Sequence, residues 1–215
     1  DSWVQTFPAN SYERRLWSRV APVTQMEYAV ARGDPAAARR AAKGARESLL
    51  QVDPGAEPSR RQTWAGILRR LHAGMVRIEL EGNDLAAAER HVQWLAAARS
   101  NLTADSLEVR RDQGVDQALS ALVLARLGRV DEARPLAAKA LAFERELHAL
   151  GTDDQMHKVD LGQALVASAA VDPVRAKALL GEAKSLLDSL PAEARALRTT
   201  RWTEGLVNDA ARSAR

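Results

Sequence analysis

The chain has 215 residues, of which 46% are hydrophobic and 27% charged, so it can bury a core and is not disordered by composition. It contains 42 Ala but only 5 Trp, 2 Tyr and 2 Phe, a bias that favours helices over sheets. The net charge is only +3 and there is no cysteine, which excludes disulfides, thiolate metal sites and cysteine nucleophiles.

The predicted elements begin with an N-terminal arm and a short helix over residues 1–21. The arm, residues 1–10, is expected to be extended, with Trp3 or Phe7 docking on the first helices. Four helix pairs follow, each interrupted by a turn and separated from the next by a polar or Gly/Pro-rich break. Their predicted ranges are 22–54, 59–100, 103–150 and 153–190. Residues 191–215 are expected to form a capping helix, beginning at Pro191, and a polar tail.

The turn within each predicted pair carries an aspartate that can cap the second helix. These residues, Asp34, Asp84, Asp131 and Asp172, are spaced by 50, 47 and 41 positions. Self-similarity with a period of 40 to 50 residues indicates stacked helix pairs. Small residues recur along the second helices, as at Ala133, Ala137 and Ala140, which lets two helices approach closely. No segment alternates apolar and polar residues long enough to predict a strand.

The segment Leu127-Gly128-Arg129-Val130-Asp131-Glu132-Ala133, followed by Ala137, Ala140 and Leu141, resembles a tetratricopeptide repeat. The resemblance extends over about residues 22 to 190, and the spacing exceeds the family's 34 residues, so the repeat is divergent. It implies an all-α fold: an α-α superhelix, or solenoid, of about four antiparallel helix pairs plus a C-terminal capping helix, in one structural domain. In this family the first helix of each pair faces a concave groove that holds a peptide or a partner helix.

Counting back from each turn, the resemblance assigns a groove face to Glu27, Arg69, His72, Glu79, Leu122, Arg126 and Lys158. This mixed polar set suits a charged partner segment, because carboxylates bond bidentately to Arg. We therefore expect a non-catalytic protein-interaction or scaffold module without a cofactor. Self-association is a further expectation, since solenoid ends expose apolar surface unless they are capped.

The setting of the module also follows from composition. Only five of the 31 basic residues are Lys, and such Ala- and Arg-rich usage is typical of high-GC bacterial genomes. The chain has no apolar run of membrane-spanning length and no signal-peptide pattern at its start, and it begins with Asp1. We expect a soluble sensory or tethering domain of a longer bacterial protein, in a cytoplasmic or an extracytoplasmic compartment.

The first alternative is a nucleic-acid-associated regulator. Arg doublets occur at 14–15, 39–40, 60–61, 69–70 and 110–111, and they could form a phosphate-binding ridge. Trp64 and Trp202 lie near further arginines and could stack on single-stranded bases. Against this reading, the arginines are interleaved with Glu and Asp, whereas a dedicated binder shows an unpaired basic stripe. The competing interpretation is that both tryptophans plug seams between repeats.

The second alternative is a metal-dependent enzyme. His148, Asp153, Asp154 and His157 combine imidazoles with carboxylates around one turn, as catalytic metal sites do. The two aspartates are equally suited to cap the start of a helix. No Gly-x-Ser-x-Gly elbow and no phosphate-binding loop occurs in the sequence, so no other catalytic motif supports this alternative.

Overall fold

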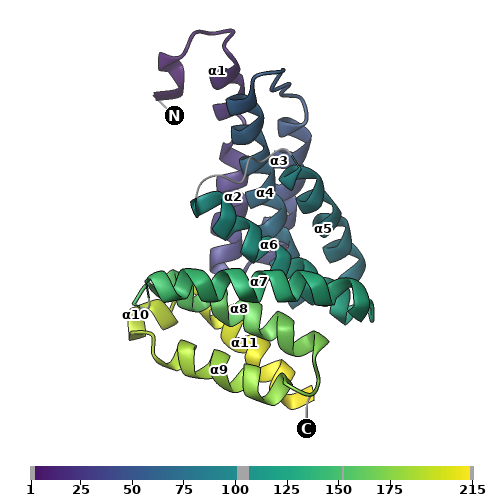
Figure 1. The fold of residues 1–215 in the computed structure, drawn as a ribbon. Coiled ribbons are helices and arrows are strands. Elements are labelled where there is room, and N and C mark those ends of the chain that lie inside the picture. Colours follow the sequence, from purple (N-terminus) through teal and green to yellow (C-terminus); the bar gives the residue numbers. More distant parts are fainter. Residues whose placement is uncertain (1–2, 101–106, 152, 214–215) are drawn as a thin grey trace. The chain divides into compact units, whose positions relative to one another are not determined.

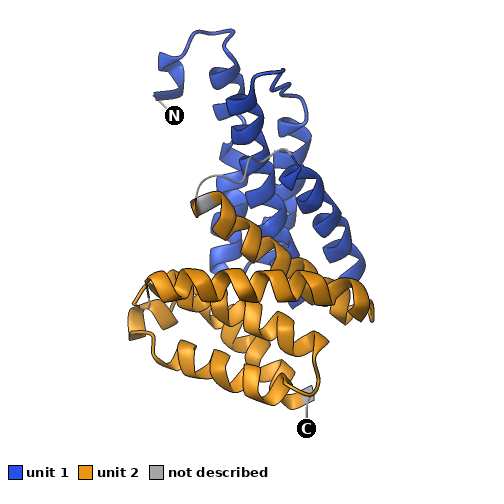
Figure 2. Ribbon diagram, in the orientation of Figure 1, with its two compact units in different colours: residues 1–103 blue, residues 104–215 orange. Residues whose placement is uncertain are grey.

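The computed structural model describes residues 3–100, 107–151 and 153–213 (Figure 1). Every regular element in these ranges is helical and none is a strand, which confirms the all-α prediction. The chain divides into two compact units, residues 1–103 (unit 1) and 104–215 (unit 2), coloured separately in Figure 2. The boundary falls between the second and third predicted pairs. That the whole chain forms one structural domain stays a prediction.

Where the structure describes unit 1, it forms a short 3₁₀ helix and five α-helices. They are η1 (Trp3–Thr6), α1 (Tyr12–Trp17), α2 (Ala21–Arg32), α3 (Pro35–Leu49), α4 (Pro58–Glu81) and α5 (Leu85–Arg99). Helix α2 pairs with α3 and α4 pairs with α5, while α4 also packs against α2 and α3. The arm was expected to be extended but is partly helical, since residues 3–6 form η1. As expected, Trp3 docks on the first helix: its ring lies 5.5 Å from the ring of Trp17 in α1.

The described residues of unit 2 form six helices. They are α6 (Leu107–Arg126), α7 (Val130–Leu150), α8 (Gln155–Val171), α9 (Ala176–Asp188), α10 (Ala192–Arg195) and α11 (Arg198–Ser213). Helix α6 pairs with α7 and α8 with α9, and α8 also packs against α6 and α7. The predicted third pair began at Thr103, which lies outside the described residues. Within the described chain no helix is long and apolar enough to cross a membrane.

The C-terminal helix is broken where a single helix was expected. The chain forms the one-turn helix α10 after Pro191 and begins α11 only at Arg198. Helix α11 packs on α8 and α9 through the buried side chains of Trp202, Leu206 and Val207. The break lets the chain turn so that this apolar face of α11 meets the last helix pair.

Three of the helix pairs share one turn. A residue in the left-handed region ends the first helix: Gly33 (φ 70°), Asn83 (φ 56°) and Gly128 (φ 78°). The next residue donates its N–H to the carbonyl five positions back, at 2.9 Å in each case: Asp34 to Ala29, Asp84 to Glu79 and Arg129 to Leu124. This is the Schellman pattern that closes a helix C-terminus. Asn83 takes the place expected for Gly82, since Asn also tolerates this conformation.

Buried positions recur at fixed distances from that left-handed residue. Five residues after it stand Ala38, Ala88 and Ala133, and twelve after it Ala45, Leu95 and Ala140; all six are fully buried. The fourth pair is joined differently, because the Asp172 carboxylate accepts from the Arg175 N–H at 3.1 Å in a turn without a left-handed residue. Adjacent antiparallel pairs with common packing positions are compatible with a helical repeat.

The aspartate caps are confirmed at two of these turns and wrong at the third. Asp34 accepts from the Ala37 N–H and Asp84 from the Ala87 N–H, both at 2.9 Å. In α7 the N-cap is Arg129, which makes no side-chain capping bond. Asp131 lies in the first turn of that helix and pairs with Arg134 at 3.2 Å, because the shared turn places residue 129 at the capping position.

Candidate binding site

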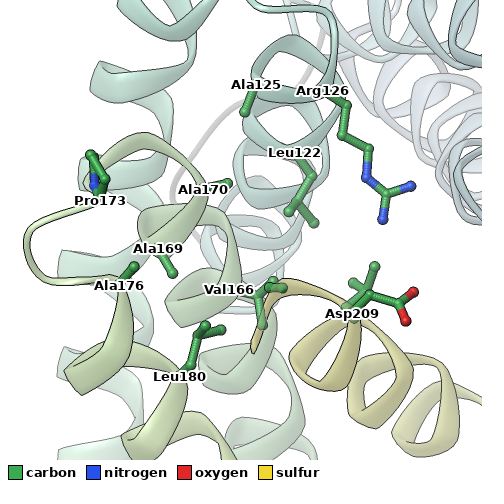
Figure 3. Close-up of a pocket in the computed structure, with 12 residues that line it drawn as sticks. Leu122, Ala125, Arg126, Val166, Ala169, Ala170, Pro173, Ala176, Leu180 and Asp209 are labelled. Carbon is green, nitrogen blue, oxygen red and sulfur yellow. The ribbon is translucent and has the colours of Figure 1, made fainter. Parts of the chain in front are cut away.

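A cavity of about 430 Å³ lies within unit 2 (Figure 3). Helices α6 and α8, the first helices of their pairs, form two of its walls, and α9 and α11 complete it. Its lining residues are Leu122, Ala125, Arg126, Val166, Ala169, Ala170, Pro173, Ala176, Leu180, Leu206, Asp209 and Ala210. Ten of these twelve side chains are apolar, so the cavity suits an apolar group.

Residue size explains why space remains at this place. Five lining residues are alanines, which allow the helices to pack while leaving room between their exposed edges. The apolar lining includes the buried side chains of Leu122, Val166, Leu180 and Leu206. The two charged residues, Arg126 of α6 and Asp209 of α11, lie on the same side of the cavity in Figure 3. Binding sites for small groups share this plan of an apolar pocket with a few orienting polar groups.

Two of the seven predicted groove residues, Leu122 and Arg126, line this cavity. Lys158 is half-buried near the start of α8 and is not among the lining residues. The other four belong to unit 1. There Glu27 forms an ion pair with Arg70 (2.7 Å), whereas Arg69, His72 and Glu79 are buried, with 6%, 1% and 3% of their surface exposed.

His72 and Glu79 instead take part in a polar cluster between α3, α4 and α5. The His72 ring lies 5.7 Å from the Trp94 ring in a stacked arrangement, and its Nδ1 is 2.9 Å from Nδ1 of His91. Burial, the neighbouring His91 and the charge of Arg46 lower the pKa of His72 to about 3. The imidazole is therefore neutral at physiological pH.

Glu79 is held by a second contact of the same cluster. Its carboxylate accepts from Arg39 Nε (2.9 Å) and from the terminal guanidinium nitrogen (2.6 Å). Arg46 lies 4.3 Å above the Trp94 ring. The sequence prediction placed Arg39 only in a phosphate-binding doublet and missed Arg46, His91 and Trp94. A usable signal was the seven-residue spacing of Arg39 with Arg46 and of His72 with Glu79, which places each pair on one helix face.

A second buried polar cluster lies in unit 2, between α6, α7 and α8. Arg111 donates to Asp160 through Nε (2.7 Å) and a terminal nitrogen (2.6 Å). Glu144 is fully buried, and neither of its carboxylate oxygens has a hydrogen-bond partner. Burial and the charge of Asp160 raise the pKa of Glu144 to about 8, although Arg111 opposes this shift. Glu144 was missed by the sequence prediction, although it interrupts the apolar stripe formed by Ala137, Leu141 and Leu147.

Each Arg doublet has at least one arginine engaged within its own unit. Arg39 binds Glu79, Arg60 binds Glu13 and Glu57, Arg70 binds Glu27, Arg110 binds Glu146 and Arg111 binds Asp160. In the first doublet, Arg14 and Arg15 donate to the carbonyls of Phe7 and Asn10.

The two tryptophans proposed as stacking platforms are packed into the fold. Trp64 is half-buried against the core of unit 1, with its Nε1 donating to the Leu49 carbonyl at 3.1 Å. Trp202 of α11 is 8% exposed. Trp202 is therefore closed to a nucleic-acid base, and Trp64 is tied to the fold by its ring nitrogen.

The four candidate metal ligands are not gathered into one site. Asp154 caps α8 by accepting from the N–H groups of Met156 (2.7 Å) and His157 (3.0 Å), and these bonds, chiefly that from His157, lower its pKa. Asp153 is exposed, while His148 and His157 are half-buried. In the part of the chain that the structure describes, no three His, Asp or Glu side chains are grouped so that they could hold a metal ion.

Comparisons of the chain with protein-family models, with curated proteins and with solved structures found no match. The site's function is therefore argued from its own geometry.

Proposed function

We propose that this chain is a divergent tetratricopeptide-like solenoid that acts as a non-catalytic protein-interaction module. The turn shared by three pairs and the alanines at matching buried positions support the repeat. In this proposal about four antiparallel pairs stack as an α-α superhelix, and α11 serves as the capping helix.

The observation that carries the proposal is the apolar cavity of unit 2. Two adjacent first helices, α6 and α8, form its walls, which is where a solenoid of this type holds a partner segment. An apolar side chain of that segment fills the space between Leu122, Val166 and Leu206. A carboxylate next to that side chain binds Arg126, whose guanidinium can donate two parallel N–H bonds to its oxygens.

The mechanism is rigid display. The walls are helices fixed by buried contacts, so the receptor loses little conformational freedom when the segment binds. Affinity then depends on how well one apolar anchor fits and on the charged contact at the rim. No proton transfer or bond cleavage is required of any lining residue.

A random peptide library displayed on phage and selected against the native chain tests this proposal. Enriched peptides should combine a large apolar residue with a nearby Asp or Glu. Ala170→Trp fills the cavity from an exposed lining position, and Ala178→Trp places the same ring on α9 outside it. We expect Ala170→Trp to weaken binding of the enriched peptides by about tenfold or more, and Ala178→Trp to leave their binding unchanged. Equal binding by the native chain and Ala170→Trp would show that the cavity is not the site.

No contact among the described residues favours the nucleic-acid alternative. At least one arginine of each doublet is engaged by carboxylates or carbonyls, and the two tryptophans are packed into the fold. Exposed ion pairs contribute little stability and can exchange partners, so these arginines could still bind phosphates, and a binding experiment decides. Binding of a single-stranded oligonucleotide that weakens steeply with salt would favour that alternative.

A further inference from the structure

The interface of α6, α7 and α8 contains a carboxyl group that no protein atom satisfies. Glu144 of α7 is 0% exposed, and both Oε1 and Oε2 lack a hydrogen-bond partner. Burying an ionised carboxylate without partners is very costly, and such a group takes up a proton instead. The geometry alone therefore favours the neutral acid.

Gly114 of α6 provides the space for this carboxyl. A Cβ atom at that position would lie only 2.8 Å from Cδ1 of Phe143 and closer still to Oε1 of Glu144. The absence of a side chain on α6 is what lets the acid lie against that helix. Glu144 is thus fitted into the interface and has no route out of it while α6 and α7 remain in contact.

The charges facing Glu144 come from both helices that pack against α7. Arg111 of α6 is already committed to Asp160 of α8 by two short bonds, of 2.7 and 2.6 Å. That ion pair is neutral overall, so it gives no net compensation for a second buried carboxylate. The burial of Glu144 and its nearness to Asp160 raise its pKa to about 8.

We propose that Glu144 is a buried proton-binding site that couples opening of the α6–α7–α8 interface to pH. In the closed interface Glu144 carries a proton. When α7 separates from α6 and α8, the carboxyl meets water and loses that proton. Opening therefore releases one proton and becomes more favourable as the pH rises, up to the pKa of the closed state.

The same interface supports the candidate binding site. Asp160 and the lining residues Val166 and Ala169 belong to one helix, α8, and Leu122 belongs to α6. Opening would therefore disturb two walls of the cavity. This consequence rests on the proposed function: peptide binding in the cavity should weaken as the pH rises, and Glu144→Gln should remove the effect.

Amide hydrogen exchange, corrected for the intrinsic pH dependence, tests the proton site without any ligand. Protection of α6, α7 and α8 amides that exchange through opening should fall about tenfold per pH unit between pH 6 and 8 and then level off. Glu144→Gln, which keeps the shape but cannot ionise, should abolish this fall. Glu182→Gln is the matched control, because that carboxylate of α9 is 41% exposed and should leave the native profile unchanged.

The titration of Glu144 can also be followed in the native chain by its side-chain carboxyl ¹³C shift, which needs no variant. A midpoint near pH 8 is expected. A carboxyl already ionised at pH 6, or the same exchange profile in the native chain and Glu144→Gln, would overturn the proton site. If selected peptides fail to bind at every pH, the proposed function is wrong, and the exchange experiment still judges the proton site.

Discussion

Gly114 illustrates how one missing side chain sets a helix contact. The Cβ of an alanine at this position would press on Phe143 and Glu144, and overpacking of this kind costs typically 1 to 3 kcal/mol. We expect Gly114→Ala to destabilise unit 2 by about 2 kcal/mol in urea unfolding. Gly181→Ala on α9 is the control, because nothing lies within 4 Å of its added Cβ and helical Ala is favoured over Gly. Equal effects of the two substitutions would contradict this account.

His72 predicts how unit 1 responds to acid. The pKa of His72 is about 3 in the fold and about 6.5 in the unfolded chain, so only the unfolded chain gains the proton between these values. The free energy of unfolding is therefore unaffected by His72 above pH 6.5. It falls as the pH drops from 6.5 towards 3, by up to about 1.4 kcal/mol per pH unit. His91 adds to the same trend, since burial also lowers its pKa.

Urea unfolding at a series of pH values measures this trend. Four of the five tryptophans, Trp3, Trp17, Trp64 and Trp94, lie in unit 1, so tryptophan fluorescence mainly reports that unit. His72→Phe should flatten the dependence of unfolding free energy on pH between 6.5 and 4. His148→Gln, in unit 2, should leave it unchanged. If His72→Phe kept the native slope, His72 would not be the residue responsible.

At the scale of helices, the aspartate caps differ in what they contribute. Asp84 accepts from a backbone N–H at the start of α5, and loss of such a cap costs about 1 kcal/mol. Asp131 makes only an exposed ion pair in the first turn of α7, and such pairs contribute little. We expect Asp84→Ala to lower the unfolding free energy of its unit by about 1 kcal/mol and Asp131→Ala by less than about 0.5 kcal/mol. The same loss in both variants would show that the cap geometry is not what matters.

The helix locations were largely predictable, because turn residues and the spacing of small apolar residues are read from neighbouring positions in the sequence. Gly33 and Gly128 mark two turns correctly, and the buried alanines follow from their spacing after those turns. The turn at Gly82-Asn83 was less predictable, since both residues can adopt the left-handed conformation and tertiary packing selects Asn83. The break between α10 and α11 depends on how α11 meets α8 and α9, which local rules do not contain.

Two residues that line the candidate site were predictable from the sequence. Leu122 and Arg126 were counted back from Gly128, the residue that does end α6, and both line the cavity. His72 and Glu79 were counted from Gly82, one residue before the left-handed position. The same distances counted from Asn83 give Ala73 and Leu80, which are buried as well. Helix α4 packs against α2, α3 and α5, and His72 and Glu79 are therefore buried against α3 and α5. Glu144 was overlooked although it interrupts the apolar stripe of α7, but that it lacks a hydrogen-bond partner could be learned only from the neighbouring helices.

At the scale of the molecule, each unit has its own core. Unit 1 buries Leu16, Met26, Leu49, Leu71 and Ile78, and unit 2 buries Leu119, Leu147, Leu165 and Leu187. We expect residues 104–215, prepared alone, to show a helical circular dichroism spectrum and a cooperative urea transition, and residues 1–103 to do the same. A fragment that stays unfolded would show that its core depends on the other unit.

The central claim is that the cavity of α6, α8, α9 and α11 binds a partner segment. The most direct measurement is a methyl NMR titration of the full chain with an enriched peptide. We predict shift changes concentrated on Leu122, Val166, Leu180 and Leu206, with Leu71 and Ile78 of unit 1 unaffected, and loss of these changes in Ala170→Trp. Binding that leaves the cavity methyls unmoved, or that persists unchanged in Ala170→Trp, would contradict the account.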